Sequence, residues 1–161
     1  MKKLKINYGF ILEYYLVLTL MGMIFAIYKN NIFLFLSYLF LVFVIDFIPT
    51  LYIILNYLEY NSKTEVMFFE EAISVVSKNF EKTILIDQIN QIFIFASPFI
   101  IKKRKLRFSV HESLFYARIK MKDEEDIILT SLLRPNLYEN LEKIGGDKIV
   151  KMKGLFNTIK K

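Results

Sequence analysis

Residues 8–28, YGFILEYYLVLTLMGMIFAIY, and residues 32–58, IFLFLSYLFLVFVIDFIPTLYIILNYL, decide the fold of this chain. At about 1.5 Å per residue the first run forms a helix of ~31 Å, enough to cross a hydrocarbon core of about 30 Å. The second would be ~40 Å long, so we expect its last turn to leave the lipid or the helix to tilt. Lys29, Asn30 and Asn31 alone separate the runs, so the helices must be antiparallel.

The composition divides the chain into two parts. Of its 161 residues, 55% are hydrophobic and 16% aromatic, above the usual share in soluble proteins. Before Glu59 there are only six charged residues: Lys2, Lys3, Lys5, Glu13, Lys29 and Asp46. A signal peptide is disfavoured, because no small-residue cleavage site precedes the second run. We therefore predict a transmembrane helical hairpin in residues 1–60, with spans at about 8–28 and 32–57, and a separate domain in residues 61–161.

Lysine placement predicts the orientation of the hairpin. Lys2, Lys3 and Lys5 precede the first span, and the loop between the spans carries one lysine. Positive residues favour the cytoplasmic side, so the N-terminus is expected there, and a hairpin returns residues 61–161 to the same side. Tyrosines gather toward that end, as in an interfacial aromatic belt: Tyr8, Tyr14, Tyr15, Tyr52, Tyr57 and Tyr60.

Glu13, Asp46 and Pro49 interrupt the apolar spans. Glu13 lies sixteen residues before Lys29 and Asp46 sixteen after Asn30, so a tight hairpin places both carboxyl groups at similar depth. Pro49 lacks the N–H that would bond the carbonyl four residues back, which predicts a kink. One interpretation is a proton- or cation-handling site, or a contact with another membrane subunit. The other is that Glu13 reaches water and Asp46 is a packing contact.

The remainder of the chain shows the period of strands. We expect strands at Glu65–Phe69, Ala72–Ser77, Lys82–Asp87, Gln88–Ala96, Phe115–Lys122 and Ile127–Leu132. A helix is expected from Arg134, with Pro135 in its first turn and Gly145-Gly146 as its stop. Lys148–Phe156 alternates lysine with apolar residues and is either a late strand or a segment on the membrane surface. Such a meander of six or seven strands buries a core by curling into a small sandwich or barrel.

The segments AISVVSKNFEKTILIDQINQIFIF (residues 72–95) and FYARIKMKDEEDIILTSLL (residues 115–133), placed after two spans and before a closing helix, resemble a bacterial family. This is the YcxB-type group of membrane-anchored proteins with a pleckstrin-homology-like (PH-like) domain. The resemblance implies an α+β membrane protein in which a split β-barrel or sandwich is closed by a C-terminal helix. It also implies the bacterial cytoplasmic (inner) membrane, and it implies no activity.

The sequence offers little chemistry for catalysis or metal binding. Cysteine is absent and His111 is the single histidine, which disfavours thiol catalysis and zinc sites. His111-Glu112-Ser113 has no accompanying nucleophile elbow, and the five glycines form no phosphate-binding loop. Asp123–Asp126 lacks the spacing of a calcium loop and favours a hairpin turn. We expect no catalytic residues, no metal and no cofactor.

The densest charge run is basic and consists of Lys102, Lys103, Arg104, Lys105 and Arg107. Each basic residue near an anionic membrane contributes about 1 kcal/mol, so the run could clamp lipid headgroups. Alternatively, it is a solvated loop that helps to enforce topology. Nucleic acid is disfavoured, because neither glycine-rich nor stacking aromatic residues surround the run.

Two functions remain open from the sequence. The first is a non-enzymatic membrane-anchored module that presents a PH-like domain to a protein partner or to anionic lipid, with no small-molecule substrate. The second is a small accessory subunit of a membrane complex, for transport, secretion or toxin immunity, which acts through the hairpin and Asp46.

Overall fold

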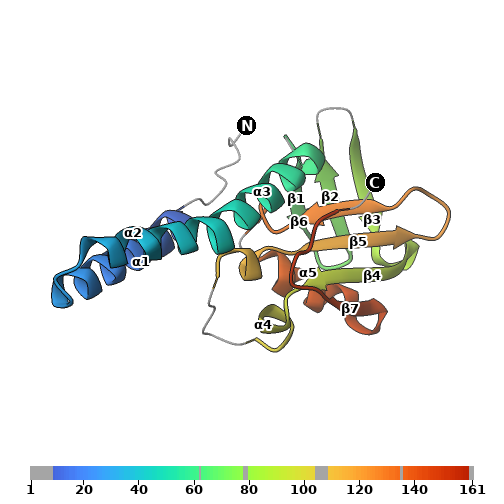
Figure 1. Ribbon diagram of the computed structural model, residues 1–161. Helices are drawn as coiled ribbons and strands as arrows, with labels where there is room; N and C mark the ends of the chain where they lie inside the picture. Colours follow the sequence, from blue (N-terminus) through green and yellow to red (C-terminus); the bar gives the residue numbers. More distant parts are fainter. Residues whose placement is uncertain (1–8, 62, 78–79, 104–108, 135, 160–161) are drawn as a thin grey trace.

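The computed structural model describes residues 9–61, 63–77, 80–103, 109–134 and 136–159. Two antiparallel helices project from a body of two β-sheets, and the second helix continues across that body (Figure 1). The first helix is α1 (Gly9–Tyr28); the second comprises α2 (Ile32–Val42), a π-helical turn (Phe43–Phe47) and α3 (Ile48–Asn61). Within these residues, Ile11–Tyr28 and Ile32–Asn61 are long and apolar enough to cross a membrane. The predicted pair of apolar helices is confirmed.

The two helices of the hairpin are joined by a tight turn at the tip and approach each other closely in the middle. Asn30 adopts a left-handed conformation (φ 48°), and the Asn31 side chain caps α2 by accepting a 3.0 Å hydrogen bond from the Phe33 N–H. Farther along, Gly22 is buried, and a Cβ at that position would come within 2.4 Å of the Tyr38 ring. The missing side chain at Gly22 therefore allows the two helices to approach closely.

The second helix changes its hydrogen-bond pattern just before Pro49. The Ile48 N–H bonds to the Phe43 carbonyl, five residues back, which defines the π-helical turn. Pro49 has no N–H to offer the carbonyl of Ile45, so the ordinary α-helical pattern is broken at this place in any case. The interruption expected at Pro49 is thus accommodated by a wider turn, and Asp46 lies within it.

In the described part of the chain, seven strands form two sheets. The first contains β1 (Glu65–Phe68), β2 (Ala72–Val76) and β3 (Glu81–Leu85), in that order and antiparallel. The second has the order β6-β5-β4-β7 and contains β4 (Ile89–Ala96), β5 (Tyr116–Met121), β6 (Ile127–Thr130) and β7 (Ile149–Lys153). All six predicted strands are present, and the Lys148–Phe156 segment supplies the seventh. A closed barrel is not shown, and β7 departs from a meander because it pairs in parallel with β4.

Two short helices complete the body. α4 (Pro98–Ile101), which the sequence did not predict, is capped by the Ser97 hydroxyl, which accepts from the Ile100 N–H. α5 (Leu137–Gly145) is the predicted C-terminal helix; Pro135 lies outside the described residues. α5 ends where predicted, since Gly146 takes a positive φ of 46° and a Cβ on Gly145 would lie 2.7 Å from Ile149.

The hydrophobic core has two parts. The larger part lies between the sheets and α5, and its fully buried members include Ile73, Ile84, Ile92, Ile94, Ile119, Leu129, Leu137 and Leu141. The smaller part joins α3 to the second sheet through Ile53, Ile54, Tyr57, Leu114, Tyr116, Leu132 and Ile159. Ile53 is 1% exposed and Tyr57 0% exposed. The end of the second helix is therefore packed into the body.

Candidate functional site

One face of the second helix is buried against the body from Asp46 onward. Asp46, Thr50, Ile53, Tyr57 and Asn61 follow one another at intervals of three and four residues, and all are buried. This spacing places them in one stripe along the helix. The stripe combines apolar and polar side chains, so each polar one needs a partner from the body.

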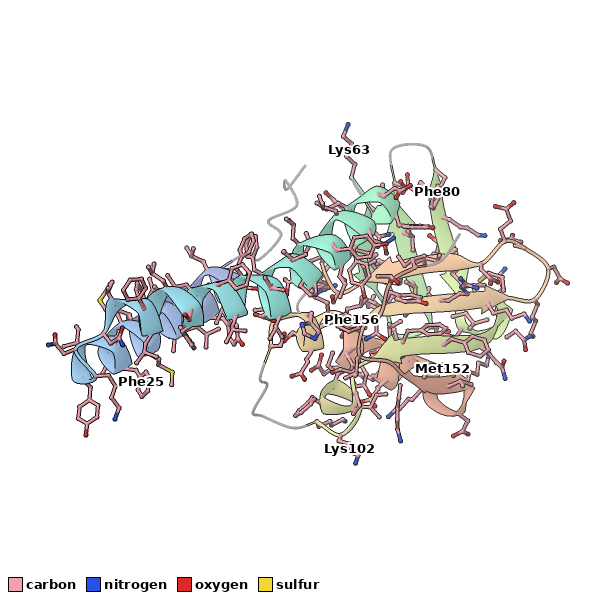
Figure 2. All side chains as sticks on the ribbon, viewed as in Figure 1. Phe25, Lys63, Phe80, Lys102, Met152 and Phe156 are labelled. Carbon is pink, nitrogen blue, oxygen red and sulfur yellow. The ribbon has the colours of Figure 1, made fainter. Side chains whose placement is uncertain are left out.

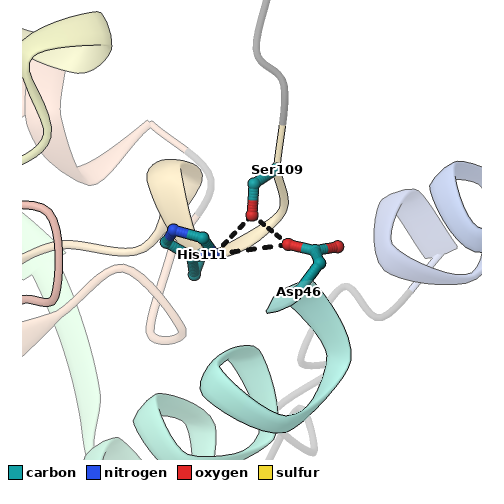
Figure 3. Close-up of polar contacts among 3 residues, drawn as sticks. All are labelled: Asp46, Ser109 and His111. Atoms are coloured by element: carbon teal, nitrogen blue, oxygen red, sulfur yellow. Dashed lines mark hydrogen bonds and ion pairs between the residues drawn. The ribbon is translucent and has the colours of Figure 1, made fainter. Parts of the chain in front are cut away.

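Asp46 meets Ser109 and His111 where the hairpin joins the body (Figure 3). The Ser109 hydroxyl donates to Asp46 Oδ1 and also contacts His111 Nδ1, and Nδ1 lies 3.2 Å from the same carboxylate oxygen. His111 Nδ1 thus lies within hydrogen-bond distance of both oxygens. We call these three residues the junction cluster.

The junction cluster does not have the geometry of a hydrolytic triad. In such a triad the imidazole stands between the two other residues, with one ring nitrogen facing the hydroxyl and the other the carboxylate. Here His111 Nδ1 alone faces both Ser109 and Asp46. The imidazole also stacks on the Phe156 ring, at 5.0 Å between centroids and 17° between planes. The arrangement can therefore fasten the hairpin to the body, and it is not the arrangement of a hydrolytic site.

Three buried polar groups lie together beside the cluster: the hydroxyls of Tyr15 and Thr50 and the carboxylate of Asp46. The Tyr15 hydroxyl interacts with both of the others. Tyr15 belongs to α1, and its ring packs edge-on against Phe47, with 5.6 Å between centroids. α1 therefore reaches the level of the junction cluster and contributes a polar group to it.

The intramembrane candidates have different surroundings. Glu13 is exposed on α1, whereas Asp46 is buried toward the body, so the two carboxylates are not brought face to face. The contact between Tyr15 and Phe47 nevertheless places residues 13 and 46 near the same level of the hairpin, as their spacing predicts. Pro49 is half-buried immediately after the π-helical turn.

The basic run is only partly described. Lys102 and Lys103 follow α4 and are exposed, with Lys102 at the edge of the body (Figure 2); Arg104, Lys105 and Arg107 lie outside the described residues. Lys103 forms a 2.8 Å ion pair with Glu142, which also pairs with Lys151 at 2.6 Å. Burial would raise the pKa of the Glu142 carboxyl, but hydrogen bonds from both lysines outweigh it and lower the pKa. Part of the charge of the run is thus balanced from within the body.

A groove of about 490 Å³, which the sequence did not predict, opens beside the end of α3, between the β2–β3 hairpin and β6. Its apolar lining includes Val75, Phe80, Ile127 and Ile128. Its acidic lining consists of Glu81, Glu125 and Asp126, the last two from the β5–β6 turn that the sequence predicted. Lys82 also lines the groove but pairs with Glu124. The groove thus combines apolar and acidic side chains on a protein whose net charge is +6.

Comparison with known protein families, curated proteins and solved structures finds no match for this chain. The resemblance to the YcxB-type group therefore stays a prediction. Among the residues that the structure describes, no three His, Cys, Asp or Glu side chains converge in a way that could hold a metal ion.

Proposed function

We propose that this chain is a non-enzymatic, membrane-anchored binding module. The hairpin holds the body, a PH-like domain, at the cytoplasmic face of the bacterial inner membrane, and both chain ends lie in the cytoplasm. The observation that carries the proposal is the continuous helical segment Ile32–Asn61, with its π-helical turn, which begins in the apolar hairpin and ends buried against the second sheet. A flexible linker would let a domain rotate freely, whereas a buried helix fixes its orientation.

This fixed orientation gives the faces of the body different surroundings. The side that carries the junction cluster and Phe156 faces the hairpin, and therefore the bilayer (Figures 2 and 3). The groove lies beside Tyr60 and Asn61, at the end of the second helix that is farthest from the hairpin tip. The first side suits lipid, and the groove suits a partner in the cytoplasm.

Anionic lipid is the first proposed ligand, and the basic run is its proposed site. The test replaces Lys102, Lys103, Arg104, Lys105 and Arg107 with Gln in the full chain, because an isolated 60–161 fragment would lack the buried end of α3. The variant should retain less anionic lipid during purification, as measured by native mass spectrometry. A matched control replaces five exposed lysines elsewhere: Lys63, Lys120, Lys122, Lys143 and Lys153. If both variants lose the same amount of lipid, the loss reflects the change in net charge and not the basic run.

A cationic, partly apolar segment of a protein partner is the second proposed ligand, and the groove is its site. Its acidic residues attract positive charge, and its apolar walls add burial. In nanodiscs of zwitterionic lipid, a short peptide of alternating Lys and Leu should bind more tightly than one of Glu and Leu. Replacing Glu81, Glu125 and Asp126 with their amides should remove the difference, whereas amides at the exposed Glu65, Glu70 and Glu71 should not. Equal binding of both peptides to the unmodified chain would exclude the groove.

The accessory-subunit function is the alternative, and it rests on Asp46 in the hairpin. The contacts of Asp46 that the structure describes lie within the chain, on Ser109 and His111, which favours the module. A pull-down in mild detergent distinguishes the binding module from the accessory subunit. If stable subunits are recovered with the chain and are lost on Asp46→Asn but not on neutralisation of the basic run, the alternative holds.

A further inference from the structure

The part of the hairpin that projects beyond the junction cluster is short. From Ile32 to Asp46 the second helix extends ~21 Å, and from Tyr15 to Tyr28 the first extends ~20 Å. Both lengths are ~10 Å less than a hydrocarbon core of about 30 Å. If the polar loop at Lys29–Asn31 lies at the far surface, the core must reach past Asp46 toward the body.

The free face of the second helix shows how far the lipid can reach. On the side turned away from the body, Ile48, Leu51 and Leu55 are exposed and apolar. The first charged residue after them is Glu59. From Ile32 to Leu55 the exposed apolar face measures ~35 Å, which is enough to span the core. At the levels between Asp46 and Leu55 the helix therefore contacts the body on one side and meets lipid on the other.

Residues near the end of the chain lie beside the next turn of this helix, at Asn56 and Tyr57. Residues 154–159, which we call the C-terminal strap, run along the hairpin side of the body (Figure 1). The Tyr57 hydroxyl donates to the Asn157 carbonyl at 2.7 Å. The Asn56 side chain donates to the Ile159 carbonyl at 3.2 Å and accepts from the Ile159 N–H at 2.8 Å. These bonds fix the strap against α3.

The strap presents apolar side chains to its surroundings. Leu155 and Phe156 are each 58% exposed, although Asn157 and Ile159, which follow them, are buried. Phe156 points from the hairpin side of the body and stacks on His111, so it lies at the level of the junction cluster (Figure 2). Neighbouring apolar side chains exposed on a rigid segment indicate a contact surface. The level of Phe156, within the length that lipid must cover, favours the lipid bilayer as the partner.

We infer that the C-terminal strap is a second membrane-contacting element, with Leu155 and Phe156 inserted at the boundary between headgroups and acyl chains. This inference rests on the proposed membrane anchor and adds that the edge of the body is immersed with it. Aromatic and aliphatic side chains on a surface segment bind this boundary in peripheral proteins. The strap thereby sets how deeply the body sits and which of its faces remain in water.

The chain contains no tryptophan, so single tryptophans report their surroundings without background. Three full-length variants are placed in nanodiscs that contain brominated lipid: Phe40→Trp in the hairpin, Phe156→Trp in the strap and Phe80→Trp on the groove. All three phenylalanines are exposed. We expect quenching at positions 40 and 156 and none at position 80. Quenching at 40 but not at 156 overturns the inference and leaves the anchor intact, whereas no quenching at 40 removes the anchor and the inference together.

A second measurement does not depend on an aromatic substitution. Because the chain has no cysteine, Leu155→Cys and Lys63→Cys each give a single thiol. In nanodiscs, where both faces are open to reagent, a charged maleimide should label position 63 rapidly and position 155 slowly. Replacing the lipid with a mild, short-chain detergent should narrow the difference between the labelling rates at positions 63 and 155. Equal labelling rates in nanodiscs would contradict insertion of the strap.

Discussion

Asp46 is a carboxylate in an apolar helix, and its neighbours explain how it is accommodated. Isolated charges in a membrane segment are costly unless they are paired or face protein. Ser109 and His111 supply that protein face, and the π-helical turn at Phe43–Phe47 contains Asp46. A wider turn shifts the register of the residues around it, and such turns often occur at functional positions. The residue therefore joins two parts of the chain.

A double-mutant cycle tests this joining role. Asp46→Ala and His111→Ala should each destabilise the protein, and the two changes together should cost less than their sum. For residues in direct contact we expect a coupling free energy of about 1–3 kcal/mol. Unfolding in detergent micelles measures it, with Asp46→Ala and Glu139→Ala as a control pair, since Glu139 is exposed on α5. Additive effects of Asp46→Ala and His111→Ala would show that their contact contributes nothing.

Substitution of Thr50, unlike that of Asp46 or His111, is not expected to lower the free energy of unfolding. The Thr50 hydroxyl oxygen is buried and interacts with the Tyr15 hydroxyl, but without the geometry of a full hydrogen bond. Removing a buried polar group that has no full hydrogen bond can be neutral or stabilising, whereas removing one member of a bonded pair costs about 1–3 kcal/mol. Thr50→Val, which keeps the shape, should therefore leave the free energy of unfolding unchanged or raise it. A loss above about 1 kcal/mol would reveal a hydrogen bond at Thr50.

At the scale of elements, hydrophobic periodicity predicted the helical pair, six strands and α5, because each depends on residues close in sequence. α4 was missed, although Ser97-Pro98 is a helix start signal, because a four-residue helix has no period. The parallel pairing of β7 with β4, the groove and the junction cluster depend on contacts across many residues. His111 lies 65 residues from Asp46, and no local pattern predicts that meeting.

One signal in the sequence could have indicated the docked face of the second helix. Asp46, Thr50, Tyr57 and Asn61 are polar residues within or at the end of an apolar run, at intervals of four and seven. Residues at such intervals share one helix face. A polar stripe along one side of a span indicates a protein contact on that side, and this is where the body lies.

The ion pairs around Glu142 connect the segment after α4 with α5 and β7, and they predict a dependence on pH. Lys103 and Lys151 lower the pKa of Glu142, against the opposite effect of its burial. A carboxyl whose pKa is lower in the folded state contributes stability above its unfolded pKa of about 4.3 and loses it as pH falls through the folded value.

Glu142→Gln should therefore be less stable than the unmodified protein at neutral pH, and the difference should shrink in acid. Thermal unfolding at a series of pH values measures this. Glu139→Gln, one turn earlier on α5 and exposed, is the control and should show a smaller dependence. Because Glu142 already neutralises part of the Lys103 charge, Lys103→Gln should weaken the proposed lipid binding less than Lys102→Gln does. A constant difference between Glu142→Gln and the unmodified protein at all pH values would contradict the assignment.

For the whole molecule, the helix Ile32–Asn61 determines whether the body and the hairpin move as one unit. Its buried end contributes Ile53, Ile54 and Tyr57 to the smaller part of the core, and Tyr57 also bonds the strap. The larger part of the core contains no residue of the second helix. Damage to the smaller part should therefore loosen the body from the hairpin and leave the two sheets folded.

Tyr57→Ala is the substitution that tests this separation. Removing a buried aromatic side chain costs about 3–5 kcal/mol, and here the loss falls on the contact between α3 and the body. Spin labels at Lys29→Cys, on the hairpin tip, and Lys120→Cys, on β5, should give one narrow distance distribution in the otherwise unmodified chain and a broad one with Tyr57→Ala. Tyr52→Ala, on the exposed face of the same helix, should leave the distribution narrow. Circular dichroism should show the strands retained in all three proteins. If the distribution stays narrow when Tyr57 is removed, the hairpin and the body are held together by other contacts, and the orientation on which the proposed lipid and partner binding depend does not originate in this helix.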